Sequence, residues 1–139
     1  MDAPDKWLYE YSLIRFVPRI DREEFINIGM VMMNKRRKWM RGKIWIDEPR
    51  LKMFYPGVEI EALKNQCRLF ENSDVPKKDL PVEERYRWLT AVKSAVIQVS
   101  PSHPGIVATE KLCMEDVFDT PPETIMDAEF ERLFTQLVR

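Results

Sequence analysis

Apolar and polar residues alternate along the first third of the chain as β-strands require. The run 7–17 is rich in aromatic and β-branched residues, and Pro18 closes it because proline cannot donate to a strand ladder. A second alternating run covers 25–33 and places on one face the side chains of Ile26, Ile28, Met30 and Met32. A third extended run follows a polar tip and ends at Ile46. These runs predict a three-stranded meander over residues 7–46.

The hydrophobic period becomes helical after Gly57. Apolar residues at 60, 63, 67 and 70 predict an amphipathic helix over about 58–72, and a short helical turn with Pro49 near its start precedes it. Pro81 and the acidic pair that follows it predict another helix over about 82–93.

The last third of the chain mixes both periods. Residues 95–109 predict a strand pair around the turn-rich loop 100–105, and residues 125–138 predict a closing amphipathic helix. Thr124 and Asp127 resemble a capping box at its start. The fold class is therefore α+β, an antiparallel sheet with an N-terminal three-stranded meander packed by amphipathic helices.

Composition adds limits to this picture. With 139 residues, of which 45% are hydrophobic, the chain can bury one core, so we expect a single domain over 1–139. A formal net charge of −1 provides no global field for nucleic acid or an anionic membrane. Cys67 and Cys113 are too few for a disulfide framework or a zinc site. No apolar run is long enough to span a bilayer, so we expect a cytoplasmic protein without membrane contact.

Charged and amide side chains cluster around the first predicted turn. If the flanking strands are antiparallel, Arg15 and Asn27 lie side by side, and Arg15 can bind a carboxylate or phosphate with Glu24 positioning it. In the alternative reading, Arg22, Glu23 and Glu24 form a solvated loop and Asn27 holds the turn through the backbone. The candidate ligand or partner surface comprises Arg15, Arg22, Glu24, Asn27, Ser100, Ser102 and His103.

A basic run marks the second predicted turn. Arg41 and Lys43 follow it, and two tryptophans are interleaved with these cations. Cations contact phosphate and exposed rings stack on bases, although the same charges keep a hairpin tip soluble. The candidate nucleic-acid contacts are Lys35, Arg36, Arg37 and Lys38.

Catalytic signatures are missing from the sequence. His103, the only histidine, lies in a loop with two serines, but neighbouring side chains on an extended chain diverge. No metal-ligand spacing occurs, and four dispersed glycines form no phosphate loop. We therefore expect no metal, no cofactor and no catalytic residue, and a non-enzyme is favoured.

Two motifs resemble a bacterial family catalogued as domain of unknown function 3037. The first is Tyr-Ser-x-x-Arg-Phe-Val-Pro at residues 11–18. The second is a Gly-Glu-x-x-Asn-x-Gly-Val-Val pattern, matched at Glu24, Asn27, Gly29 and Val31. The chain departs from it at Glu23 and Met30, and Glu23 argues against a tight glycine turn. Later landmarks are Trp88, Leu89, Ser94, Ser100, residues 131–134, Leu137 and Val138.

The resemblance implies no activity, but genes of this family are often found beside those of HipA-like serine/threonine kinases, a toxin–antitoxin context. We expect a small interaction or regulatory module that binds another protein, such as a HipA-like kinase, or its own copy. The first alternative is a small-ligand protein or enzyme that uses Arg15, Glu24, Asn27 and the 100–103 loop. The second is nucleic-acid binding through the basic turn.

Overall fold

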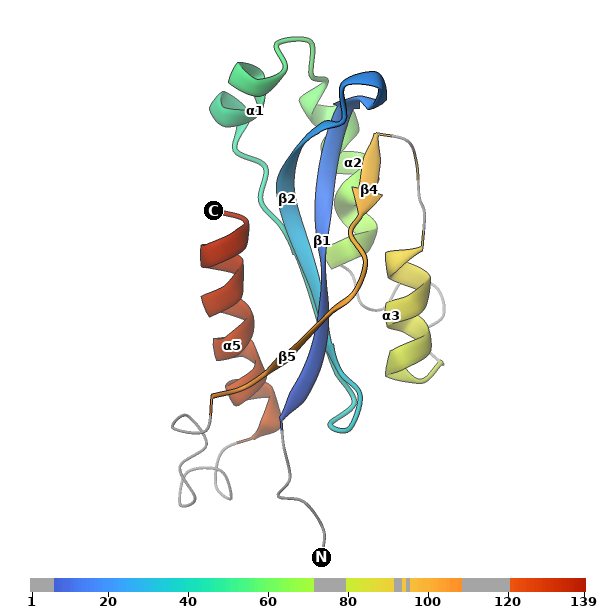
Figure 1. The fold of residues 1–139 in the computed structure, drawn as a ribbon, viewed down its shortest axis with the longest axis vertical. Helices are drawn as coiled ribbons and strands as arrows, with labels where there is room; N and C mark the ends of the chain where they lie inside the picture. The colour runs from blue at the N-terminus through green and yellow to red at the C-terminus, as the bar shows by residue number, and fades with distance from the viewer. Residues whose placement is uncertain (1–6, 72–79, 92–93, 95, 109–120) are drawn as a thin grey trace, which may run out of the picture.

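The fold is seen in a computed structural model that describes residues 7–71, 80–91, 94, 96–108 and 121–139. It is α+β, as the sequence predicts: an antiparallel sheet between layers of helices (Figure 1). Among the described residues, no helix is both long enough and apolar enough to cross a membrane.

In the part of the chain that the structure describes, the sheet has five strands. The strands are β1 (Leu8–Arg19), β2 (Glu24–Asn34), β3 (Trp39–Ile44), β4 (Ile97–Val99) and β5 (His103–Ile106). Their order is β3-β2-β1-β4, with β5 pairing β1 further along the same edge. The N-terminal meander is confirmed, and it places the long β1–β2 ribbon at the centre of the molecule.

A β-bulge in β2 changes the predicted alternation. Ile14 lies opposite Gly29 and Arg15 lies opposite Asn27, so Ile28 is an extra residue in the ladder. After the bulge, Met30 and Met32 lie in a different core from Ile28. The prediction that these residues share one face is therefore wrong beyond Ile28, because the extra residue reverses the facing of all that follow.

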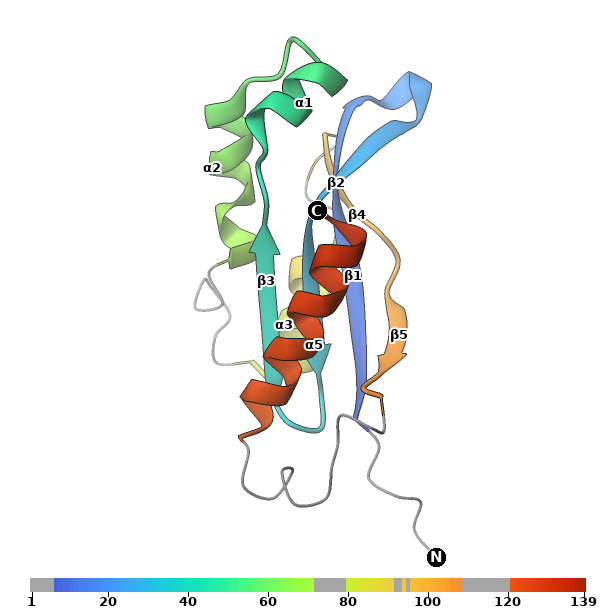
Figure 2. The same ribbon diagram turned by 90° about the vertical axis from the view of Figure 1, so that its left-hand side faces the viewer.

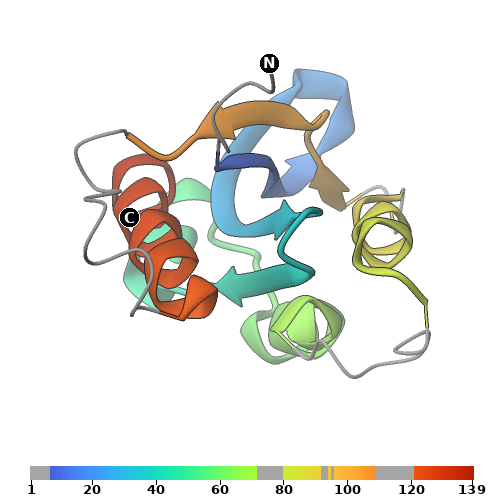
Figure 3. The same ribbon diagram turned by 90° about the horizontal axis from the view of Figure 1, so that it is seen from below.

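Within the described residues, four helices lie against this sheet (Figure 2). They are α1 (Glu48–Phe54), α2 (Ile60–Glu71), α3 (Val82–Thr90) and α5 (Pro122–Leu137), and a 3₁₀ turn, η1 (Ile20–Arg22), joins β1 to β2. Helix α5 packs on one face, whereas α2 and α3 pack on the other, which the view from below shows (Figure 3). The short helix at Pro49 is confirmed, with Asp47 as its N-cap.

Each face has its own hydrophobic core. The first core joins the sheet to α1, α2 and α3 and includes Phe16, Leu51, Phe70 and Leu89. The second joins it to α5 and includes Trp39, Phe130 and Phe134. Gly42 permits the close approach of α2, because a Cβ there would collide with the carbonyl oxygen of Phe70.

Three local predictions need correction. β1 does not end at Pro18 but continues to Arg19, and its pairing with β2 shifts register between Phe16 and Arg19. The predicted strand pair at 95–109 does not pair with itself, because β4 and β5 both pair with β1. Thr124 and Asp127 lie inside α5, whose N-cap is Pro121 without a side-chain bond. Cys67 is buried and free, and Cys113 lies outside the described residues.

Candidate functional site

One corner of the sheet exposes apolar side chains on the face that α3 covers only in part. Leu8 of β1 lies directly opposite Ile106 of β5, and these side chains are 59% and 49% exposed. Directly opposed residues in an antiparallel pair point to the same face, so they form a continuous apolar surface. We call the surface formed by Leu8, Glu10, Lys35, Pro104 and Ile106 the open corner.

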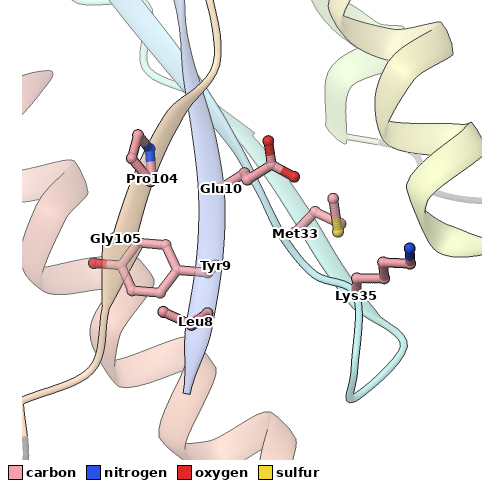
Figure 4. A pocket seen from close by; sticks show the side chains of 7 residues that line it. All are labelled: Leu8, Tyr9, Glu10, Met33, Lys35, Pro104 and Gly105. Atoms are coloured by element: carbon pink, nitrogen blue, oxygen red, sulfur yellow. The ribbon is translucent and has the colours of Figure 1, made fainter. Parts of the chain in front are cut away.

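A concavity of about 300 Å³ lies in the open corner (Figure 4). Its base includes Met33, which lies opposite Glu10 in the ladder and is otherwise buried. Glu10 and Lys35 place opposite charges around it, and Pro104 and Gly105 close it from β5. Apolar surface with a few polar groups at its rim is the lining that binding sites typically have.

A hydrogen-bond chain fixes the upper rim of the open corner. The Tyr86 hydroxyl on α3 lies 2.9 Å from the Ser12 hydroxyl and 2.9 Å from that of Ser102, and Ser102 donates to Glu10 at 3.1 Å. Burial raises the pKa of Tyr86 even though the bonds to Ser102 and Ser12 act against it. These hydrogen bonds tie α3 to β1 and to the residue just before β5, and they orient the Glu10 carboxylate.

Behind the open corner, β1 is bonded to α5. Tyr9 donates to the buried Glu129 carboxylate at 2.5 Å, and Arg132 binds both Glu129 oxygens at 3.0 and 2.8 Å. Burial, followed by the contact with Glu129, raises the pKa of Tyr9 above its usual range. Gly105 allows β5 to pass over the Tyr9 ring, which a Cβ would strike. The β1 segment that forms the open corner is therefore fastened to α5 from behind.

The residues predicted around the first turn separate into two groups. Arg15 and Asn27 are direct cross-strand neighbours, as expected. The Asn27 amide donates to the carbonyl of Leu137 at 3.1 Å, so it fastens the end of α5 rather than the turn. Arg22 and Glu24 instead pair with each other at 2.8 Å in the exposed connection.

The turn before Glu24 has the backbone conformation that glycine favours. Glu23 adopts a φ of 54°, in the left-handed region. The glutamate that stands where the family pattern has glycine therefore adopts the conformation that glycine adopts most easily.

The second predicted segment does not join Arg15 and Asn27. The Ser100 hydroxyl accepts from the Leu13 N–H at 2.8 Å, so it replaces a backbone group in the ladder. Ser102 instead takes part in the hydrogen bonds with Tyr86 and Glu10 on the α3 side of the sheet. His103 lies in β5 and packs against the Tyr11 ring, with 5.4 Å between the ring centroids. Tyr11 is four residues before Arg15 on β1, so His103 is separated from Arg15 along the sheet.

The basic run is partly used by the fold. The Arg37 guanidinium lies over the Trp7 ring at 3.5 Å. Arg41 and Lys43 bind Glu131 of α5 at 2.8 and 3.1 Å. Lys35 and Lys38 instead border a hollow of about 570 Å³ beside the start of α3, which Arg85 also lines. Arg36 is exposed at the tip.

Sequence reasoning missed the open corner and also Arg50. The apolar residues of the corner lie in strands that otherwise fill the core, so their exposure has no sequence signal. Arg50 on α1 donates to the Asn27 carbonyl at 3.3 Å and lies over the Trp45 ring. Arg50 lies beside Asn27 only because of where α1 packs, and no local sequence pattern specifies that position.

Comparisons with known proteins give one match. Residues 11–121 match the sequence model of a family described as a protein of unknown function (DUF3037). Neither the curated proteins nor the solved structures contain a significant match to the chain.

Proposed function

The chain belongs to the DUF3037 family, and we propose that it serves as a protein-interaction or regulatory module that docks another protein on the open corner. The observation that carries this proposal is the exposed cross-strand pair of Leu8 and Ile106 beside a concavity of about 300 Å³. Contiguous exposed apolar surface rimmed by polar groups is typical of binding surfaces.

The shape and charge of the corner indicate the partner's chemistry. An apolar side chain would fill the concavity, and flanking basic and acidic residues would face Glu10 and Lys35 respectively. The buried free thiol of Cys67, whose pKa burial raises to about 12, is compatible with the reducing bacterial cytoplasm that we propose as its location. By the family resemblance, a HipA-like kinase is the first partner to test.

The test introduces a charge into the corner. We expect Leu8→Glu and Ile106→Glu to fold normally and to weaken binding of the purified candidate kinase at least about tenfold, because each places a carboxylate against an apolar contact. Met53→Glu is the matched control, since Met53 is 87% exposed on α1, away from the corner. Titration calorimetry measures the affinities, and equal affinities for all four proteins would refute the proposal for this partner.

Self-association is tested on the same variants. If the partner is a second copy, the mass measured by light scattering rises with protein concentration for the wild type and for Met53→Glu. It stays at the monomer value for Leu8→Glu. A concentration-dependent mass that Leu8→Glu leaves unchanged would place the self-interface elsewhere and contradict docking at the corner.

The hollow beside the basic turn favours one second candidate, binding of a nucleic-acid backbone. Lys35, Lys38 and Arg85 line the hollow, and none has an ion pair among the described residues. Phosphates would be bound by these cations, with an affinity that falls as salt rises. A mobility shift that K35A/K38A leaves unchanged would dispose of this candidate.

A further inference from the structure

Two arginines lie near Asn27, Arg15 on β1 and Arg50 on α1. Five arginines pair with carboxylates, namely Arg19, Arg22, Arg41, Arg87 and Arg132. Arg15 and Arg50 have no carboxylate partner among the described residues, and each instead lies over an aromatic ring. Guanidinium groups held on ring faces keep their donors free for a planar anion.

Both guanidinium groups lie around Asn27. Arg15 is its cross-strand neighbour and lies 4.3 Å from the ring centroid of Phe25, two residues earlier on β2. Arg50 reaches it from α1 and donates one hydrogen bond to its carbonyl at 3.3 Å. Arg15 from β1 and Arg50 from α1 therefore each contact β2 at or next to Asn27.

The terminal nitrogens of Arg15 are not fully buried. Its Nε is buried without a partner, but its other two nitrogens, which also lack a protein hydrogen bond, are not among the buried unpartnered atoms. The side chain as a whole is half-buried, and Phe25 beside it is 46% exposed. A ligand can reach these donors without displacing the core.

The surroundings favour a singly charged anion over a dianion. The last turn of α5 ends beside Asn27, through the bond from the Asn27 amide to the Leu137 carbonyl, and a helix C-terminus carries partial negative charge. The Asn27 Oδ1 is a further acceptor, buried and unpartnered. These groups oppose the second charge of a phosphate more than they oppose a carboxylate.

We propose that Arg15 and Arg50, stacked on Phe25 and Trp45, form a carboxylate-binding site beside Asn27. The carboxylate would be that of a small molecule or of an acidic side chain of a protein, and the two guanidinium groups would bind its oxygens by charge-assisted hydrogen bonds. This site is independent of the open corner, which lies at the other end of β1 and on the opposite face of the sheet.

The test follows the Nε–Hε signals of the arginines by nuclear magnetic resonance on the full chain. Three probes are titrated separately: benzoate, a C-terminally amidated hexapeptide with two glutamates, and inorganic phosphate. We expect saturable shifts of the Arg15 and Arg50 signals with at least one carboxylate probe. If benzoate binds more tightly the site takes small molecules, and if the peptide binds more tightly it takes protein side chains.

Matched variants show whether the arginines are responsible. Arg15→Gln and Arg50→Gln should each lower the affinity for the carboxylate probe at least about tenfold, which is the loss expected when a charge-assisted hydrogen bond is removed. Arg87→Gln should leave it unchanged, since Arg87 already pairs with Glu84 on α3. Leu8→Glu should also leave it unchanged, which separates this site from docking at the corner.

The proposal is overturned by any of three results. These are the lack of saturation with both carboxylate probes, equal shifts of all arginine signals, or tighter binding of phosphate than of either carboxylate. Arg50 lies on the surface helix α1, so Arg50→Gln provides a test even if Arg15→Gln does not fold.

Discussion

The two faces of one sheet are covered in different ways. Helix α5 runs along its face from Met126, beside Asn34, to Leu137, beside Asn27, so a single helix spans nearly the whole of β2. The opposite face is shared by α2 and α3, and Tyr86 of α3 bonds to Ser12 of β1 and to Ser102. Leu8 and Ile106 of the open corner thus stay exposed on the face that two shorter helices share, whereas α5 follows the other face along most of β2.

Helix length accounts for much of this difference. At 1.5 Å per residue, the 16 residues of α5 span roughly 24 Å, whereas the nine of α3 span roughly 14 Å. Ion pairs also fasten α5 to the sheet, since Glu131 binds both Arg41 and Lys43 of β3. Both faces hold a hydrophobic core, but only the face of α2 and α3 includes the open corner.

The largest expected effect separates the covered face from the open corner. Phe130 is fully buried, stacks on Phe134 and meets the edge of Trp39, so Phe130→Ala should lower the free energy of unfolding by about 3–5 kcal/mol. The control Leu8→Ala should change it by at most about 0.5 kcal/mol. Urea denaturation measures both, and losses of similar size would mean that the corner is part of the core.

An intermediate effect concerns the alkaline limb of stability. The pKa of Tyr9 is raised in the folded state, by burial and then by Glu129, so the unfolded chain loses its proton first as pH rises. This stabilisation is complete below about pH 10, the ordinary tyrosine pKa, and declines above it. The unfolding free energy should therefore fall above pH 10 less steeply in Tyr9→Phe than in the wild type.

Tyr86→Phe gives the same comparison on the other face. Burial raises the pKa of Tyr86 as well, but hydrogen bonds with Ser102 and Ser12 favour its ionised form. Its substitution should therefore flatten the alkaline limb less than Tyr9→Phe does. Identical slopes for the wild type and Tyr9→Phe would show that Tyr9 and Glu129 are not coupled as described.

The smallest effect tests the ionic contacts of α5. Burial acts to raise the pKa of Glu131, but Lys43 and Arg41 outweigh it and hold that pKa below its usual value. The stabilisation is present above the ordinary glutamate pKa and is lost as pH falls. Because these side chains are partly exposed, Glu131→Gln should cost only about 0.2–1 kcal/mol, and less in high salt. A cost that salt does not reduce would argue against an ionic contact.

The sequence was sufficient where local rules decide the outcome. The meander follows from alternation and turn residues, and the neighbourhood of Arg15 and Asn27 follows from antiparallel pairing. The facing of Met30 could not be predicted, because one extra residue at Ile28 reverses it without changing the composition. The candidate sites were harder still, since Arg50 and Ile106 reach their neighbours through helix and edge-strand paths that only tertiary packing determines.

The bulge at Ile28 has a consequence for how the chain folds. In a regular ribbon, sliding one strand by two residues preserves which side chains are buried, so misaligned hairpins can persist. Here such a slip would carry the extra residue away from the junction of Ile14 and Arg15 and expose apolar groups on both sides of it. The bulge therefore favours one register of the β1–β2 hairpin over registers shifted by two residues.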